Sequence, residues 1–275
     1  MSKRSILITG CSSGIGLASA RLLRKRGWRV FATARTPGDL ERLTVDEQVD
    51  AVHLDLAEAK TIAACVETVL DKTGGTLDAL FNNAAYGQPG ALEDVSVDAL
   101  RAQFEVNVFG THDLCRRLIP AMLNQGHGRI VQCSSVLGII AAPYRGAYCA
   151  SKFALEALSD VMRLELTGAG IHVSTIEPGP INTRFIDSSI AAAHRWIDID
   201  GSRHRTRYTA MLEALAKGGK QTFKLEPEAV AAKLVHAVEH PRPKAHYYVT
   251  LPTYMAAIAR RTLPIRVIDW VAARS

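Results

Sequence analysis

The chain has 275 residues, of which 48% are hydrophobic and 22% charged, and its formal net charge is +6. This composition is close to that of average globular proteins and excludes a disordered, collagen-like or low-complexity protein. The longest uncharged stretches, 130–144 and 245–259, are shorter than the roughly 20 apolar residues of a spanning helix, so we expect no membrane span.

Short apolar segments alternate along the chain with longer stretches of helical periodicity. Six segments have the apolar character of buried strands: residues 6–9, 30–34, 51–54, 79–82, 129–133 and 172–176. Apolar residues at helical spacing predict helices over 17–26, 62–70, 100–123 and 148–166. The alternation predicts an α/β fold with a doubly wound parallel sheet and helices on both faces. No linker or repeat divides the sequence, so we expect one domain over residues 1–275.

Two regions depart from this alternation. Residues 185–223 lack strand signals, follow a strand end at Glu177 and include a basic cluster at 203–207. Because ligands bind beyond the carboxyl ends of parallel strands, we expect a substrate lid at about 185–223. The C-terminal extension, about 251–275, mixes apolar residues with Arg260, Arg261 and Arg266. Such an amphipathic segment can contact a membrane surface or pack on the body, the lid or a second subunit, and these alternatives stay open.

A glycine-rich turn follows the first predicted strand. It reads Thr9-Gly10-Cys11-Ser12-Ser13-Gly14-Ile15-Gly16, and a predicted helix comes directly after it. Glycines at such a turn let the backbone approach a pyrophosphate, which then lies at the helix N-terminus. The spacing alone is weak support, but its position after the first strand predicts a dinucleotide site.

The second motif is Tyr148-Cys149-Ala150-Ser151-Lys152. Residues four apart lie on one face of a helix, so Tyr148 and Lys152 are neighbours. An ammonium beside a phenol favours the phenolate and lowers the pKa of a tyrosine. Taken alone, this pair is more often a solvated helix face than a catalytic site.

Together these features resemble the short-chain dehydrogenase/reductase family, in particular its hydroxysteroid and retinol dehydrogenase branch and related bacterial aldehyde reductases. The resemblance runs from Ser5 to about Thr183 and implies a Rossmann-type domain. One departure is Ala85, where the family usually has glycine. The matching motifs are the glycine turn, Asp55, Asn82-Asn83-Ala84-Ala85, Asn107, Ser135, the Tyr148/Lys152 pair, and Pro178-Gly179-Pro180-Ile181-Asn182-Thr183.

The resemblance implies a role for each of four residues. Tyr148 is expected to be the general acid in carbonyl reduction, and Ser135 to hydrogen-bond the carbonyl oxygen, with Ser134 as the alternative. Lys152 is expected to lower the pKa of Tyr148 and to bind the nicotinamide ribose. Asn107 is expected to hold a water that links Lys152 to solvent.

The end of the second predicted strand predicts which cofactor is used. An NAD enzyme places an acid there for the ribose 2′-hydroxyl, whereas this chain has Ala34 followed by Arg35. A guanidinium suits a 2′-phosphate, and Ser12 offers a further hydroxyl, so we expect NADP. The full set of expected cofactor contacts is Gly10, Ser12, Ser13, Gly14, Ile15, Gly16, Arg35, Asp55, Leu56, Asn83, Ala84, Tyr148, Lys152, Pro178, Gly179, Ile181 and Thr183.

The expected function is hydride transfer between NADP(H) and an apolar aldehyde or ketone, or the matching alcohol. The apolar stretch 136–143, with Tyr86, Phe185 and Trp196, is expected to line the substrate side. One alternative is a 3-oxoacyl thioester reductase, in which the basic cluster at 203–207 would meet an acyl-carrier acid. A second, non-catalytic alternative is an NADP(H)-binding regulator.

Other partners and ligands are not expected. His236-Ala237-Val238-Glu239-His240 matches a zinc pattern, but no third ligand is evident, so we predict no metal site. Few aromatic residues and no basic stripe argue against nucleic-acid binding. The five cysteines form no C-x-x-C pair, and with no signal peptide evident we expect a cytoplasmic protein, in a homo-oligomer (a dimer or tetramer).

Overall fold

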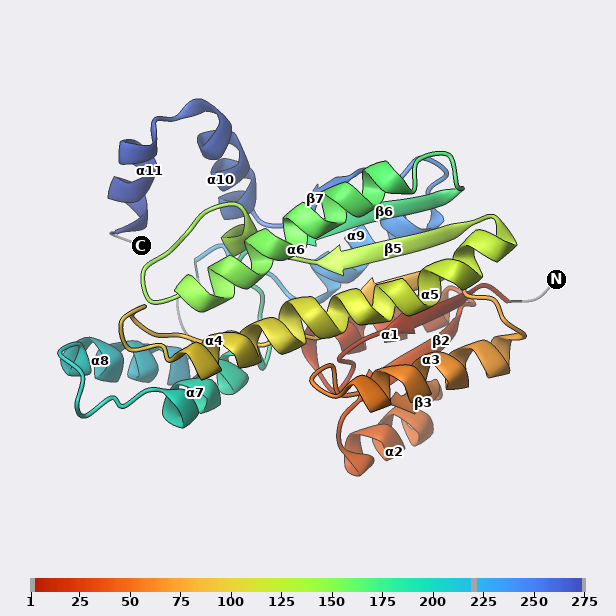
Figure 1. Ribbon diagram of the computed structural model, residues 1–275, viewed down its shortest axis with the longest axis horizontal. Helices are drawn as coiled ribbons and strands as arrows, with labels where there is room; N and C mark the ends of the chain where they lie inside the picture. Colours follow the sequence, from red (N-terminus) through yellow and green to blue (C-terminus); the bar gives the residue numbers. More distant parts are fainter. Residues whose placement is uncertain (1–2, 219–221, 274–275) are drawn as a thin grey trace.

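A single parallel sheet of seven strands organises the chain in the computed structural model, which describes residues 3–218 and 222–273 (Figure 1). The sheet order is that of a doubly wound fold, in which the chain moves outward from β1 in one direction and then in the other. In sheet order the strands are β3 (Asp50–His53), β2 (Arg29–Ala34), β1 (Ser5–Ile8), β4 (Ala79–Asn82), β5 (Gly128–Cys133), β6 (Ile171–Glu177) and β7 (His246–Tyr248).

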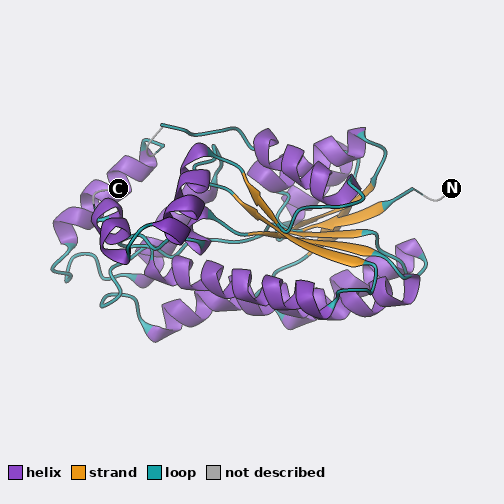
Figure 2. Cartoon of the chain, turned by 90° about the horizontal axis from the view of Figure 1, so that it is seen from above, coloured by secondary structure: helices purple, strands orange, loops and turns teal. Residues whose placement is uncertain are grey.

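Helices cover both faces of the sheet, as the alternating sequence pattern predicts (Figure 2). Their bounds are α1 (Gly14–Lys25), α2 (Pro37–Val45), α3 (Ala59–Thr73), α4 (Val97–Phe104), α5 (Thr111–Gln125), α6 (Gly146–Glu165), α7 (Phe185–Trp196), α8 (Arg205–Ala216), α9 (Glu228–Glu239), α10 (Leu251–Thr262) and α11 (Ile265–Ala272).

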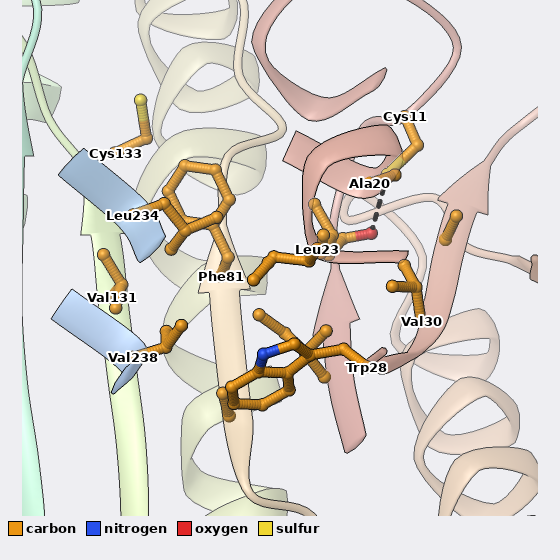
Figure 3. Packing of buried hydrophobic residues seen from close by; sticks show 14 of the residues in the cluster. Cys11, Ala20, Leu23, Trp28, Val30, Phe81, Val131, Cys133, Leu234 and Val238 are labelled. Carbon is orange, nitrogen blue, oxygen red and sulfur yellow. Dashed lines mark hydrogen bonds between the residues drawn. The ribbon is translucent and has the colours of Figure 1, made fainter. Parts of the chain in front are cut away.

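The sheet separates two hydrophobic clusters. One face packs against α1 and α9, where Leu23 and Leu234 meet Phe81 of the central strand β4 (Figure 3). The other face packs against α3, α5 and α6, with Leu80 among its fully buried side chains. Neighbouring residues of β4 therefore point into different clusters, as expected of a strand buried on both faces.

The structure corrects the sequence prediction at residues 100–123 and adds elements elsewhere. Residues 100–123 are not one helix, because a π-helical segment (Glu105–Gly110) separates α4 from α5. The seventh strand, β7, and the short helix α2 were not predicted. The described residues of 185–223 contain α7 and α8, and residues 219–221 lie outside the description. The extension contains α10 and α11, with residues 274–275 outside the description.

No helix in the described ranges is both long and apolar enough to cross a membrane.

Candidate active site

Two buried side chains on one face of α6 form the centre of the candidate site. Tyr148 and Lys152 lie one turn apart and are both at least nine-tenths buried. The Lys152 ammonium donates a hydrogen bond of 2.7 Å to the Cys133 carbonyl at the end of β5, and it lies 5.7 Å from the Tyr148 ring centroid. The predicted pair therefore faces the carboxyl edge of the sheet instead of solvent.

Burial sets the protonation state of these two groups. It raises the pKa of Tyr148 well above that of a free phenol, against the opposing effects of a hydrogen bond with Ser135 and the charge of Arg145. Burial also lowers the pKa of the Lys152 ammonium, while the charges of Cys133 and Glu156 raise it. At neutral pH Tyr148 is a protonated phenol, which is the form that donates a proton.

The two serines after β5 point in different directions. Ser135 begins the short 3-10 helix Val136–Gly138, where its Oγ accepts a 3.1 Å hydrogen bond from the Leu137 amide, and it also reaches the Tyr148 phenol. The Ser134 Oγ instead lies beside Gly138: a Cβ added to Gly138 would be 2.6 Å from it. Ser135 is thus the serine that the fold brings to Tyr148.

Asn107 occupies the π-helical segment between α4 and α5. Its side-chain amide donates to the Tyr86 carbonyl at 3.0 Å and to the Ser151 hydroxyl at 3.1 Å, and its Oδ1 accepts from the Tyr86 amide at 3.2 Å. Within the described chain no hydrogen bond joins Asn107 to Lys152. The contacts that Asn107 makes hold the segment after β4 against α6.

The glycine turn after β1 has the geometry of a phosphate cradle. Gly10 and Gly14 have left-handed φ values of +73° and +56°, which favour glycine. A Cβ at Gly16 would lie 2.2 Å from the Gly10 carbonyl oxygen, a backbone atom that cannot move aside. Ser13 begins α1 without a side-chain cap, and no acid stands in the first turn, so amide groups remain for an anion. The turn therefore fits a dinucleotide pyrophosphate.

Hydrogen bonds tie this turn to the segment that follows β4. The Thr9 hydroxyl accepts hydrogen bonds of 2.9 Å from the amides of Asn83 and Ala84, and the Asn83 side chain donates to the Thr9 carbonyl at 2.9 Å. A Cβ on Gly10 would lie 3.0 Å from the Ala84 side chain. The two predicted motifs thus form one surface.

The other expected cofactor contacts lie at the carboxyl ends of the same strands. Asp55 and Leu56 follow β3, and the Leu56 carbonyl approaches so closely that a Cβ on Gly110 would lie 2.0 Å from it. Thr183 lies beside Gly14, where an added Cβ would be 3.0 Å from it. Pro178, Gly179 and Ile181 follow β6 directly, and Ser12, Ser13 and Ile15 belong to the glycine turn.

Near the end of β2, helix α2 contributes one residue, Arg42, that the sequence analysis missed. Ala34 is buried and Arg35 exposed, as expected of a strand end. Arg42 of α2 also reaches the glycine turn, donating a 2.5 Å hydrogen bond to the Ser12 carbonyl, and it pairs with Asp39 at 3.0 Å. The sequence signal that could have revealed Arg42 is the helix start at Thr36. The Thr36 hydroxyl caps α2 by accepting a hydrogen bond from the Asp39 amide.

The side chains of the zinc-like motif at 236–240 contact other residues of the protein. The His236 Nδ1 lies 2.8 Å from the Tyr247 hydroxyl, and its ring stacks on His240 at a centroid distance of 4.4 Å. Glu239 accepts hydrogen bonds from Arg26 and Trp28. The motif therefore connects the end of α9 to its neighbours.

Comparison with known proteins gives consistent matches. The family model described as short chain dehydrogenase matches residues 4–193. The chain is 43% identical to an uncharacterized oxidoreductase, YbbO, of Escherichia coli K12, over 97% of this chain and 93% of that protein. It is 33% identical to human 17-beta-hydroxysteroid dehydrogenase type 1, over 91% of this chain and 78% of that protein.

Two solved structures illustrate the likeness of fold. A short chain dehydrogenase/reductase from Burkholderia phymatum, in complex with NAD, has a TM-score of 0.79 at 26% identity, covering 100% of this chain and 97% of that one. An actinorhodin polyketide ketoreductase with NADPH has a TM-score of 0.73 at 28% identity, covering 90% of this chain and 95% of that one. The solved neighbours thus bind either nicotinamide cofactor.

The close approach at Gly16 yields a direct test of the cradle. Gly16→Ala should weaken NADPH binding by at least about tenfold, or about 1.4 kcal/mol, because its methyl displaces the Gly10 carbonyl. Gly38→Ala is the matched control, since nothing lies within 4 Å of a Cβ there. Fluorescence titration of both variants, after melting curves establish that they are folded, measures the effect. Equal affinities would show that the turn does not bind the cofactor.

Proposed function

Since this chain belongs to the short-chain dehydrogenase/reductase family, we propose that it transfers hydride between NADP(H) and an apolar aldehyde or ketone, or the matching alcohol. The observation that carries this proposal is the buried Tyr148 phenol, with Ser135 in contact and Lys152 one helical turn away. A phenol in that setting is a proton donor at the edge of a sheet that also presents a phosphate cradle.

Each residue of the site has a separate task in the proposed reduction. The bound cofactor supplies the hydride to the carbonyl carbon. Tyr148 donates its phenolic proton to the carbonyl oxygen, and Ser135 donates a hydrogen bond to the same oxygen, where negative charge develops. Lys152, held by the Cys133 carbonyl, supplies positive charge next to the phenol and hydrogen-bond donors for the nicotinamide ribose.

Apolar side chains support the choice of an apolar substrate. The Phe185 ring packs on Tyr148 with centroids 5.5 Å apart, and Tyr86 is half-buried beside Asn107. We expect Trp196, at the end of α7, and the apolar stretch 136–143, after β5, to line the substrate side together with these two residues.

The preference for NADP rests on charge at the end of β2. No carboxylate stands at Ala34 to accept from a ribose 2′-hydroxyl or to repel a 2′-phosphate. Arg35 is exposed and forms no ion pair within the described chain. Arg42 hydrogen-bonds the Ser12 carbonyl. Two guanidinium groups near this position favour the phosphate.

The thioester-reductase alternative loses its main support. Arg203 pairs with Glu93, Arg205 with Asp200 at 3.3 Å, and the Arg207 guanidinium lies 4.7 Å from the Tyr144 ring centroid. These three cations are engaged within the protein, which leaves less charge for an acyl-carrier acid. The non-catalytic alternative is disfavoured by the intact Ser135, Tyr148 and Lys152 arrangement.

Three further assignments accompany the proposal. Exposed apolar side chains on α6 and the π-helical segment, among them Phe109, Val161 and Leu164, support a homo-oligomer.

No residue of α11 is buried, and its apolar side chains stand beside Arg260, Arg261 and Arg266, which supports peripheral membrane contact by the extension. Five buried free cysteines support the cytoplasm as the compartment.

We expect the segment 185–223 to act as a substrate lid. Phe185 contacts Tyr148, and α7 and α8 pack on each other, so closing this segment would exclude water from the carbonyl. Hydrogen exchange of α7 and α8 should slow when NADP and a substrate alcohol are both bound. Equal exchange in the free and bound protein would contradict a lid.

The role of Tyr148 is tested by removing one oxygen atom. Tyr148→Phe should lower kcat for aldehyde reduction by about 10²–10⁴-fold, the usual contribution of general acid catalysis, while NADPH affinity changes little. Since burial raises the pKa of Tyr148 above that of a free phenol, the phenol stays protonated in mildly alkaline solution, and reduction by the unmodified protein should not decline there. A variant with near-normal kcat would remove Tyr148 from the reaction.

The cofactor preference is tested by exchanging charge at the end of β2. Charge-assisted hydrogen bonds contribute about 1.5–3 kcal/mol, so NADPH should exceed NADH in kcat/KM by about one to two decades. Arg35→Ala should weaken NADPH and leave NADH nearly unchanged, and Ala34→Asp should favour NADH. Equal use of both cofactors by the unmodified protein, or equal losses in Arg35→Ala, would contradict the proposal.

A further inference from the structure

Arg145 is a partly buried cation beside Tyr148. Among the described residues, no acidic side chain pairs with Arg145. It stands directly before α6, three residues from Tyr148, and burial lowers the pKa of its guanidinium. Among the described residues, no side-chain hydrogen bond or ion pair engages it. The ionisable groups whose charge acts on it are Tyr148 and Cys149, and neither is a carboxylate.

The position of Arg145 makes its charge costly. The N-terminus of a helix is the positive end of the helix dipole, so a cation there is disfavoured, and α6 has no acid in its first turn. Two arginines of the neighbouring segment do have an acidic partner: Arg203 has Glu93, and Arg184 has Asp187 at 3.2 Å. A desolvated, unpaired cation needs a compensating anion, and the described residues do not supply one.

The backbone of Arg145 lies beside the segment that follows β4. It forms a backbone bridge with Gly90, and the Gly90 amide donates to the Tyr144 carbonyl at 2.9 Å. The same segment after β4 meets the lid, since a Cβ on Gly87 would lie 3.0 Å from the Phe185 ring. Arg145 is thus next to the place where Tyr148, Phe185 and the segment after β4 converge.

We propose that Arg145 binds an anionic group of the carbonyl substrate, a carboxylate or a similar oxyanion. This inference rests on the proposed function and deepens it: the substrate is amphipathic, with an apolar body and an acidic group. A guanidinium presents several donors in one plane, which matches the two oxygens of a carboxylate. Binding this group would compensate the unpaired charge and orient the carbonyl toward Tyr148.

A second role for Arg145 has to be separated from this one. Its positive charge acts on the phenol, so it could serve only to make Tyr148 more acidic. In that case every substrate would respond equally to its removal. A substrate-binding role instead changes the ratio of charged to neutral substrates.

The experiment compares matched aldehydes that differ in charge. The pairs are 4-carboxybenzaldehyde against its neutral methyl ester, and 6-oxohexanoate against hexanal, all assayed with NADPH. The unmodified protein should prefer the charged member in kcat/KM by at least about tenfold. Arg145→Met should abolish this preference and Arg145→Lys should retain part of it. Arg205→Met, which removes an exposed arginine of α8 instead, should leave it intact.

The outcomes separate the inference from the proposed function. Turnover of neutral and charged aldehydes with equal kcat/KM overturns the anion site and leaves the proposed function standing. An equal loss for all four aldehydes in Arg145→Met, with the alkaline limb of the pH profile displaced upward, assigns Arg145 to Tyr148 alone and also overturns the anion site. No turnover of any aldehyde by the unmodified protein overturns both. Melting curves identify variants that fail to fold. If Arg145→Met does not fold, the charged and neutral aldehydes are compared with Arg145→Lys instead.

Discussion

The burial of a lysine ammonium at the end of β5 is the constraint around which the site is arranged. Lys152 is 3% exposed, and in the described part of the chain its ammonium donates one hydrogen bond, to the Cys133 carbonyl. Removing a cation from water is costly unless polar groups replace the water, so Lys152 fixes where α6 sits on the sheet. Once α6 is fixed, Tyr148 is fixed one turn earlier, and its phenol shares the same desolvated surroundings.

The π-helical segment Glu105–Gly110 adapts the neighbouring helix to this arrangement. A π turn inserts an extra residue into the helical repeat, and here it brings Asn107 to the Tyr86 backbone and to Ser151 on α6. At the end of the same segment Gly110 lets the helix approach the Leu56 carbonyl. One irregular turn therefore connects the segment after β4, the turn after β3 and α6.

The sequence was sufficient for most of the order of strands and helices, because that depends on local spacing, and the Tyr148/Lys152 pair was identified because several family motifs occur together in order. It was insufficient for β7, whose three residues His246, Tyr247 and Tyr248 have no buried apolar run and form a strand only by pairing with β6. The break at Asn107 was missed because apolar periodicity continues through it. No sequence pattern marks Arg145, because its lack of an acidic partner is visible only in the folded chain. The roles assigned to the site residues remain predictions.

Glu177 joins the two ends of the longest excursion from the sheet. Its buried carboxylate accepts hydrogen bonds from the His246 Nδ1 at 2.7 Å and from the Tyr247 amide at 3.0 Å, so β6 and β7 stay in register at the place where the chain leaves and returns. The entropy of closing a loop grows only with the logarithm of its length, about 0.6 kcal/mol for each doubling. The part of this excursion that holds α7 and α8 can therefore change in length with little effect on the sheet, whereas α9 is bound to the sheet by its buried Leu234. The side chains that this excursion places beside Tyr148, such as Phe185, can thus change without moving α6.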